Sequence, residues 1–354
     1  MNPLKRLGAL RKKMAQLDIE ALLVSQPENR RYLSGFTGSA GYLIITAGAA
    51  VLATDFRYVE QAGRQAPDFK LCQISGEASV WLPKILAEIS FQELAFEADD
   101  LSVSRYDKLK EGTAGLGIGL TATRRLVEDL RRRKEPGEIE LIGRAVTLAD
   151  EAMAYATDIL RPGLTELELG WEIESHLRTH GSEALPFEVI IAAGPNAALP
   201  HARPSNRPIG RGESVVIDIG ARVEGYVSDL TRTLCVGKPG VEFQKIYDTV
   251  LRAQARAEEN ITAGMTGHAA DHLARSVIAA SGYGECFGHG LGHGLGLVAH
   301  EEPRLGPGSP DLLQNNMVFT VEPGIYLPGW GGVRIEDTVM LKNGKIIILS
   351  RSRK

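Results

Sequence analysis

The feature that most constrains this sequence is a pair of acidic residues inside one predicted apolar hairpin. The stretch 213–237, ESVVIDIGARVEGYVSDLTRTLCVG, predicts two strands, at about 214–219 and 226–236. Each strand contains one aspartate within its apolar run, Asp218 and Asp229. Because a charged group is costly to bury without a partner, these two residues restrict how the hairpin can pack.

The turn of this hairpin contains Glu224-Gly225. If Asp218 and Asp229 face each other, the pairing is centred between Val223 and Glu224, and their Cβ atoms lie roughly 4.5–5.5 Å apart. Two carboxylates at that distance repel each other, and one must stay protonated unless a divalent cation lies between them. For either aspartate taken alone, a solvent-facing position on its strand is the alternative.

The same pattern recurs in residues 317–341, MVFTVEPGIYLPGWGGVRIEDTVML. Glu322 and Glu336 lie at equal distances from Gly329, in the middle of the predicted loop LPGWGG. Burying four carboxylates without cations would cost several kcal/mol each in desolvation. Because the charge of four carboxylates is neutralised by two divalent cations, the two hairpins together predict a dinuclear metal site.

The stretch 287–303, FGHGLGHGLGLVAHEEP, combines alternate glycines with His289, His293 and His300. A helix is unfavourable here because each glycine costs roughly 1 kcal/mol in a helix. An extended chain places His289 and His293 on one face, and glycine lets the backbone approach a bulky group closely. The stretch matches neither phosphate-binding pattern, GxxxxGK[ST] or GxGxxG before a helix, so nucleotide binding is not expected.

Two further histidine pairs occur in helical patterns, His176 with His180 and His268 with His272. Spacing of four residues places both rings of a pair on one helix face. Neither pair has the glutamate of an HExxH motif or an adjacent group of acids. We therefore interpret both as ordinary surface or half-exposed histidines.

Composition favours a globular protein of two domains. The chain has 354 residues, more than a single hydrophobic core usually serves. A net charge of −4 gives no reason to expect nucleic acid or an anionic membrane as partner. The three cysteines are far apart and form no CxxC pair, which fits a reducing compartment. The sequence has no signal-peptide pattern and no membrane-spanning apolar run, so the expected location is cytoplasmic.

Helical and strand patterns divide the chain near its first third. Residues 1 to about 120 alternate helical patterns with short apolar runs such as ALLVS, GYLIIT and AVLAT, which predicts an α/β layer. A Pro-Gly pair breaks the charged helical region that follows, so we expect a domain boundary within 125–137. Beyond it, the pattern predicts long helices at about 138–160 and 165–180, apolar strands, and a helical stretch at about 241–281.

Taken in order, the fragments IDIG and SDLTRT, HGLGHGLGLVAHEEP, TVEPGIY and RIED resemble the pita-bread metallopeptidases of the aminopeptidase P/prolidase/creatinase family. The ordered set is specific, although each fragment alone is weak. The resemblance covers nearly the whole chain, because YLSGFTGSAGYLIIT and TDFRY resemble the family's N-terminal domain. It implies an α/β (α+β) fold: a creatinase-type domain over 1–125, a helical linker over 126–137 and a pita-bread catalytic domain over 138–354.

Carried over position by position, the resemblance implies a set of site residues. The five metal ligands would be Asp218, Asp229, His293, Glu322 and Glu336. Three histidines match supporting or substrate-binding positions, and Arg334 matches a family arginine near the acids; the histidines are His201, His289 and His300. Four carboxylates and one imidazole fit Mn²⁺ or Co²⁺ at least as well as Zn²⁺. One position departs from the family, because Val298 stands where an acidic or polar residue is expected.

The resemblance implies a metal-dependent Xaa-Pro aminopeptidase, which hydrolyses the Xaa-Pro bond at the N-terminus of peptides. Such a site would use a water that bridges two divalent ions roughly 3.5–4 Å apart. Glu322 is the candidate for taking the proton of this water. His201 and His300 are candidates for hydrogen bonds to the substrate carbonyl and the developing oxyanion, and His289 for a supporting role. The resemblance also implies a homodimer through the N-terminal domain.

Four alternatives are compatible with the same motifs to different degrees. An Xaa-Pro dipeptidase (prolidase) would use the same site. Creatinase, a hydrolase without a metal, is disfavoured because all five ligand types are present. Methionine aminopeptidase would not need the first 125 residues, and the intact ligand set argues against an inactive binding module.

Overall fold

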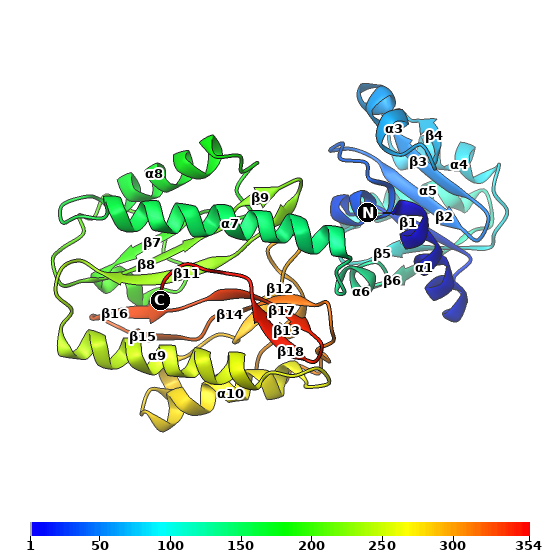
Figure 1. Ribbon diagram of the computed structural model, residues 1–354. Coiled ribbons are helices and arrows are strands. Elements are labelled where there is room, and N and C mark those ends of the chain that lie inside the picture. Colours follow the sequence, from blue (N-terminus) through cyan, green and yellow to red (C-terminus); the bar gives the residue numbers. More distant parts are fainter. Residues whose placement is uncertain (1) are drawn as a thin grey trace. The chain divides into compact units, whose positions relative to one another are not determined.

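The computed structural model describes residues 2–354, and the chain divides into two compact units between Arg131 and Arg132 (Figure 1). The division falls inside the stretch 126–137, in which the sequence predicts a linker. None of the helices in the described part of the chain combines the length and the apolar character needed to cross a membrane.

The N-terminal unit is a mixed sheet of six strands with helices packed on it. Its elements are α1 (Pro3–Gln16), β1 (Ala21–Val24), α2 (Pro27–Ser34), β2 (Tyr42–Thr46), β3 (Ala50–Thr54), η1 (Phe56–Tyr58), α3 (Val59–Gln65), β4 (Lys70–Gln73), α4 (Ala78–Leu86), β5 (Glu93–Glu97), α5 (Val103–Ala114), β6 (Gly119–Thr123) and α6 (Glu128–Arg131). The strand order is β4-β3-β2-β1-β5-β6, and β1, β5 and β6 run parallel. The predicted α/β layer is confirmed, because the three apolar runs named above form β1, β2 and β3.

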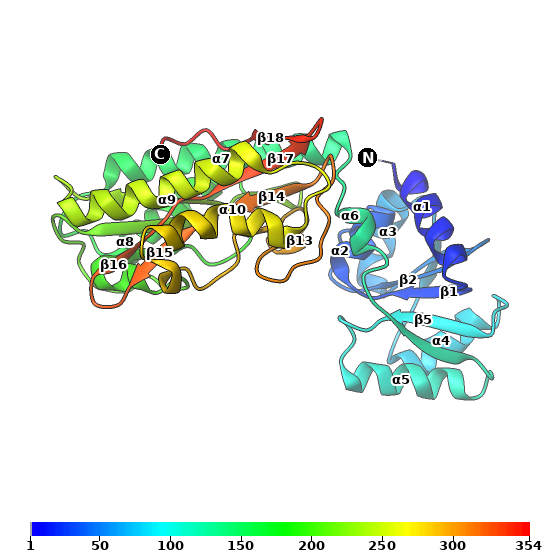
Figure 2. The same cartoon turned by 90° about the horizontal axis from the view of Figure 1, so that it is seen from below.

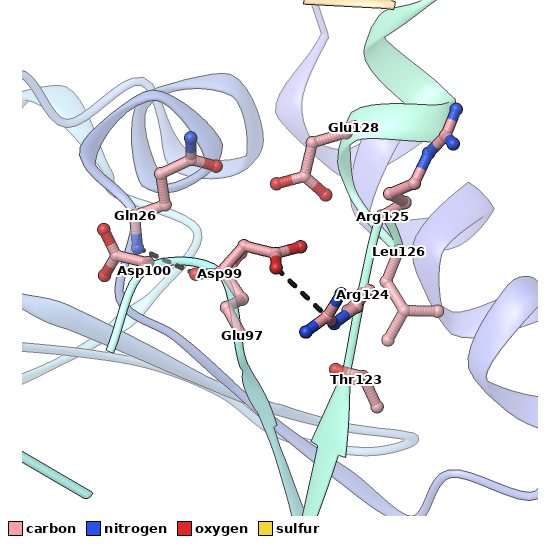
Figure 3. Close-up of a pocket in the computed structure, with 9 residues that line it drawn as sticks. All are labelled: Gln26, Glu97, Asp99, Asp100, Thr123, Arg124, Arg125, Leu126 and Glu128. Atoms are coloured by element: carbon pink, nitrogen blue, oxygen red, sulfur yellow. Dashed lines mark hydrogen bonds and ion pairs between the residues drawn. The ribbon is translucent and has the colours of Figure 1, made fainter. Parts of the chain in front are cut away.

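A small pocket lies beyond the carboxyl ends of β1, β5 and β6, and Glu97 is one of the residues that line it (Figure 3). Glu97 accepts hydrogen bonds of 2.7 Å from the backbone N of Ser25 and of Gln26 and from Asn29 Nδ2. Burial outweighs these bonds and raises the pKa of Glu97 to about 7, with the charge of Glu128 adding to the shift. The ionised form of Glu97 is therefore unfavourable in the folded unit.

The stability of the N-terminal unit is expected to fall as the pH rises from about 4.5 to 7, because the unfolded chain releases the Glu97 proton in this range and the folded unit keeps it. A folded-state pKa raised by this amount corresponds to a loss of roughly 3 kcal/mol, complete above pH 7. Glu97→Gln is expected to remove this fall, and the exposed Glu60→Gln is the control. The measurement is denaturant unfolding followed by Trp81 in a chain carrying Trp171→Phe and Trp330→Phe. Equal pH dependence with and without Glu97→Gln would contradict the prediction.

The C-terminal unit contains the predicted hairpins between two pairs of helices. Its elements are α7 (Pro136–Ile159), α8 (Glu166–Thr179), β7 (Ile190–Ala193), η2 (Gly194–Ala198), β8 (Ser214–Ile219), β9 (Arg222–Val223), β10 (Tyr226–Val227), β11 (Leu230–Cys235), α9 (Val241–Asn260), α10 (Gly267–Ala280), η3 (Gly284–Cys286), β12 (Gly292–Gly294), β13 (Glu301–Leu305), β14 (Val318–Val321), β15 (Gly324–Leu327), β16 (Gly331–Arg334), β17 (Asp337–Lys342) and β18 (Lys345–Ile348). Helices α7 and α8 pack over β7 to β11, and α9 and α10 pack on the strands that follow (Figure 1). Figure 2 shows the same layers from below.

The helix boundaries follow local capping chemistry. Pro136 occupies the first turn of α7, where its missing N–H costs nothing, and Glu135 and Glu138 form a capping box. A second capping box, formed by Thr165 and Glu168, begins α8. The helical stretch predicted at 241–281 is two helices, because the chain leaves α9 at Asn260 and starts α10 at Gly267.

The first hairpin forms with a register that differs from the predicted one. Val223 pairs with Tyr226 and Asp218 pairs with Thr231, so Asp229 is a diagonal neighbour of Asp218. The cause is the turn, because Glu224 and Gly225 both have positive φ values, 45° and 80°, and form a two-residue loop. A shift of two residues keeps both aspartates on one face of the sheet.

The second hairpin has the predicted register. Val321 pairs with Asp337 on one side and Gly324 pairs with Arg334 on the other. Glu322 and Glu336 therefore fall opposite each other where the β14–β17 ladder passes into the β15–β16 ladder. The symmetric position at Gly329 is confirmed as the centre of this pairing.

Candidate metal centre

Five side chains from five separate segments converge between the two helix pairs. Asp218 lies on β8 and His293 on β12, whereas Asp229, Glu322 and Glu336 lie in the irregular residues between strands. Ligand atoms of Asp229, His293 and Glu336 all lie within 4.8 Å of one another. His293 Nε2 is 3.3 Å from Glu322 Oε1 and 3.8 Å from Asp229 Oδ2. Within residues 2–354, the one group of three or more such side chains that could hold a metal ion is Asp229, His293 and Glu336.

The carboxylates of this cluster strongly oppose one another's ionisation. Burial first, and then the charges of neighbouring acids, raise the pKa values of Asp229 and Glu336 well above their usual range. Burial also raises the pKa of Asp218, whereas the charge and hydrogen bond of Arg334 act to lower it. Burial acts in the same direction on Glu322, but its hydrogen bond with His293 and the charge of that histidine lower the pKa of Glu322 to about 2.

The donor atoms fit divalent cations. Asp218 Oδ1 is buried and accepts no hydrogen bond from any residue between 2 and 354, so an acceptor inside the cluster is available to a cation. His293 Nδ1 lies 3.1 Å from the carbonyl of Gly294, so Nε2 is the ring nitrogen that faces the acids. Hard carboxylate oxygens with one imidazole are a donor set for Mn²⁺, Co²⁺ or Zn²⁺.

Hydroxyl and guanidinium groups orient the acids from outside. Thr231 Oγ1 donates to Glu336 Oε2 at 2.6 Å, and Thr320 Oγ1 donates to Glu322 Oε1 at 3.0 Å. Arg334 Nη2 donates to Asp218 Oδ2 at 2.6 Å. The two threonines were missed by sequence reasoning. Thr231 and Thr320 each lie two residues from an acid of the cluster, a spacing that shares one strand face and could have identified them.

The candidate histidines lie at different places around the cluster. The His300 ring centroid is 4.2 Å from that of His293, whereas His289 Nε2 lies 2.8 Å from the hydroxyl of Tyr326. Burial lowers the pKa values of His289 and His300, and the charge of His201 adds to both shifts. His201 itself is exposed, in the loop after η2.

Tyr326 connects the histidine side of the site to the acids. Arg334 Nη1 donates to the Tyr326 hydroxyl at 3.0 Å, while Nη2 of the same arginine binds Asp218. Arg334 is buried, and its pKa is raised well above the usual range because burial is outweighed by Tyr326, Asp218 and Glu322. Tyr326 was also missed, since its partner His289 lies far away in the sequence.

The glycines of 287–303 pack against neighbouring strands. A Cβ on Gly292 would collide with the carbonyl oxygen of Thr320 on β14, and one on Gly294 would collide with that of Glu302 on β13. The expectation of close backbone approach is confirmed, but the surface approached is strand backbone and not the acids of the cluster. These contacts place His293 between β13 and β14 with its ring toward the acids.

The helical histidine pairs have other surroundings. The rings of His176 and His180 stack at 3.9 Å, and Tyr155 stacks on His176 at 4.4 Å, so the two imidazoles lie face to face. His268 Nδ1 accepts a hydrogen bond from the backbone N of Gly308, and His272 is exposed on α10. Neither pair belongs to the group of side chains around His293.

The layered fold and the buried group of acids define a metal-dependent hydrolase, because hard-oxygen clusters of this type activate water in hydrolytic enzymes. Residues 140–343 match the model of metallopeptidase family M24, and residues 6–132 match the creatinase/prolidase N-terminal domain. The chain belongs to metallopeptidase family M24. Its fold is therefore the expected one, a creatinase-type α/β domain followed by a pita-bread domain.

Relatives of known structure span nearly the full chain. The Xaa-Pro dipeptidase from Bacillus anthracis is 40% identical, with a TM-score of 0.96 over 100% of this chain and 99% of that one. The X-Pro aminopeptidase from Thermotoga maritima is 35% identical, with a TM-score of 0.89 over 98% and 97%. The Xaa-Pro dipeptidase of Pyrococcus horikoshii is 36% identical over 94% of this chain and 93% of its own.

Proposed function

We propose that this protein is a dinuclear metallo-exopeptidase that hydrolyses the Xaa-Pro bond at the N-terminus of peptides. The observation that carries the proposal is the convergence of Asp229, His293 and Glu336 within 4.8 Å, with Glu322 beside them, in a chain of family M24. The relatives above that are named for cleaving Xaa-Pro bonds support the substrate class.

The proposed ligands are Asp218, Asp229, His293, Glu322 and Glu336, and the proposed ions are two Mn²⁺ or Co²⁺. When bound, these ions supply Lewis acidity and lower the pKa of a water molecule at the site. Glu322 would accept a proton from this water, because its Oε1 lies 3.3 Å from His293 Nε2, beside the other acids of the cluster. Arg334 holds Asp218 in place and, with Tyr326, keeps the carboxylates in one orientation.

The proposed role of the other histidines is to bind the reacting carbonyl. The ring of His300 packs against that of His293. His201 lies in an exposed loop, and the charge of this histidine acts on both His289 and His300. As hydrogen-bond donors they stabilise the charge that develops on the carbonyl oxygen during attack. His289 supports the site by its contact with Tyr326. The amide before proline lacks an N–H, so substrate recognition depends on shape and on these carbonyl contacts.

A second candidate function is the Xaa-Pro dipeptidase, which differs in substrate length. It is favoured by the Bacillus anthracis and Pyrococcus horikoshii relatives, which are named dipeptidases, whereas the Thermotoga maritima relative is named an aminopeptidase. We further propose a cytoplasmic homodimer; the three free cysteines fit a reducing compartment.

The purified protein loaded with Mn²⁺ or Co²⁺ is expected to cleave both the Gly-Pro dipeptide and Gly-Pro-Xaa tripeptides, with a higher kcat/KM for the tripeptides if it is an aminopeptidase. Release of glycine measured by chromatography gives the two rates, and Gly-Ala-Xaa is the control substrate. A higher rate on Gly-Pro would establish the dipeptidase instead. Failure to cleave either proline substrate with two ions bound per chain would contradict the proposed function.

A further inference from the structure

The segment between α6 and α7 contains Lys134, a lysine that is buried in the C-terminal unit. Lys134 Nζ lies 2.9 Å from Glu301 Oε2, and the two side chains are only 1% and 7% exposed. The backbone N of Lys134 also donates to the carbonyl of Asn316 at 2.7 Å. Lys134 lies between the two matched stretches, 6–132 and 140–343, so neither family description includes it.

Glu301 fixes the loop that leads to His300. Its Oε1 accepts hydrogen bonds from the backbone N of Leu297 at 2.8 Å and of Val298 at 3.2 Å. Because Glu301 directly follows His300, one carboxylate closes the short loop that ends in this histidine. Gly296 leaves no space at this point, since a Cβ there would lie 2.8 Å from Glu301 Oε2 and 2.9 Å from Lys134 Nζ.

A second basic residue of the same segment binds near the other end of β13. Arg132 Nη2 lies 2.9 Å from Asp311 Oδ1, and Asp311 Oδ2 accepts a hydrogen bond from the backbone N of Arg304 at 2.9 Å. Strand β13 runs from Glu301 to Leu305, so Lys134 and Arg132 together secure it near both ends. Of the two, Lys134 acts on the end next to His300.

We propose that Lys134 is a positioning residue that holds His300 beside the metal centre through Glu301. A carboxylate that binds two backbone amides with one oxygen and an ammonium with the other is restricted to one orientation. Without the Lys134 ammonium, the charge of the Glu301 carboxylate is less well compensated. The carboxylate then moves to a better hydrated position, and the loop 297–300 moves with it. The His300 ring would then leave its place 4.2 Å from His293. This inference rests on the proposed function, because His300 contacts the substrate in that proposal.

The test compares Lys134→Met, Lys134→Arg and the control Lys238→Met, which replaces an exposed lysine. In metal-loaded protein, Lys134→Met is expected to raise the hydrogen-exchange rate of peptides covering 295–301 about tenfold, while peptides from β14 and α9 keep wild-type exchange. Two ions per chain remain bound. The kcat on Gly-Pro-Xaa falls roughly 10- to 100-fold with a smaller change in KM, because a displaced donor is lost mainly in the transition state. Lys134→Arg keeps a cation beside Glu301 but is larger than the packed space allows, so it restores only part of both properties, and Lys238→Met leaves them unchanged.

A double-mutant cycle with Glu301→Gln tests the pairing itself. Lys134→Met combined with Glu301→Gln is expected to exchange less and to turn over faster than Lys134→Met alone, because the amide introduced at position 301 carries no charge. Wild-type exchange at 295–301 in Lys134→Met would overturn the proposal. Increased exchange throughout the C-terminal unit would also overturn it, since the lysine would then stabilise the whole unit. If the wild-type protein cleaves no Xaa-Pro peptide, the proposed function fails, and the exchange measurement still decides the role of Lys134.

Discussion

Asp229→Asn is expected to abolish peptidase activity by preventing the metal centre from loading. Asp229 contributes one of the three ligand atoms that lie within 4.8 Å of one another, and an amide supplies neither the charge nor the ligand strength of a carboxylate. Losing only a hydrogen-bond partner of a ligand costs 10- to 100-fold, so loss of the ligand is expected to lower metal affinity and kcat/KM by more than about 100-fold. Elemental analysis and turnover of Gly-Pro-Xaa measure the two effects.

The same substitution is expected to stabilise the metal-free protein. Burial, with Glu336 and Asp218, raises the folded-state pKa of Asp229 well above its usual 3.8, so the ionised form opposes folding. This penalty is absent at a pH below the pKa of the unfolded chain and grows as the pH rises above it. Metal-free Asp229→Asn should therefore melt at a higher temperature than metal-free wild type at pH 7, and at a similar temperature near pH 3.

The exposed Asp158→Asn on α7 is the matched control and is expected to change neither metal content nor melting temperature. Two bound ions per chain in Asp229→Asn would contradict its assignment as a ligand. A metal-free Asp229→Asn that is less stable than metal-free wild type at pH 7 would contradict the account of repulsion among the acids.

Chelation of the metals from the wild-type protein is expected to lower the melting temperature of the C-terminal unit by roughly 10–20 °C. An ion present at about 100 times its Kd adds about 2.7 kcal/mol to stability, and two ions add about twice that. Restoring Mn²⁺ or Co²⁺ should recover both the melting temperature and activity. The N-terminal unit serves as the internal control and is followed by Trp81, which packs in its core, in a chain carrying Trp171→Phe and Trp330→Phe.

Metal loading at neutral pH is also expected to release protons. Asp229 and Glu336 have raised pKa values in the metal-free protein, and a cation favours their ionised forms. Calorimetric titrations in buffers of different ionisation enthalpy measure the number of protons released. Metal binding without proton release, or a melting temperature that chelation does not change, would contradict this account of the cluster.

The sequence was sufficient to predict the parts of the fold that depend on local pattern. The helix expected at 138–160 is α7, Pro136–Ile159, because a Pro-Gly start and a regular apolar face mark it clearly. The second acidic hairpin was also predicted with its register. There the pairing of the two strands is centred on Gly329 in the glycine-rich loop, and the two glutamates lie symmetrically around this residue.

The register of the first hairpin was wrong because the turn geometry was not visible in the sequence. Glu224 adopts a φ of 45°, a conformation that glutamate rarely takes, so the turn centre lies one residue later than the acids suggest. The supporting contacts were missed for another reason. Lys134 pairs with Glu301 across 167 positions and Tyr326 pairs with His289 across 37, and no local pattern links such residues.

The five proposed ligands come from separate segments between Asp218 and Glu336, and this has a consequence for biosynthesis. A chain still emerging from the ribosome has no complete binding site until the strand after Glu336 has been made and paired with β14. Shorter fragments lack Glu336 and strand β17, so they lack one of the five proposed ligands. Complete loading of the proposed centre therefore requires that both hairpins have closed.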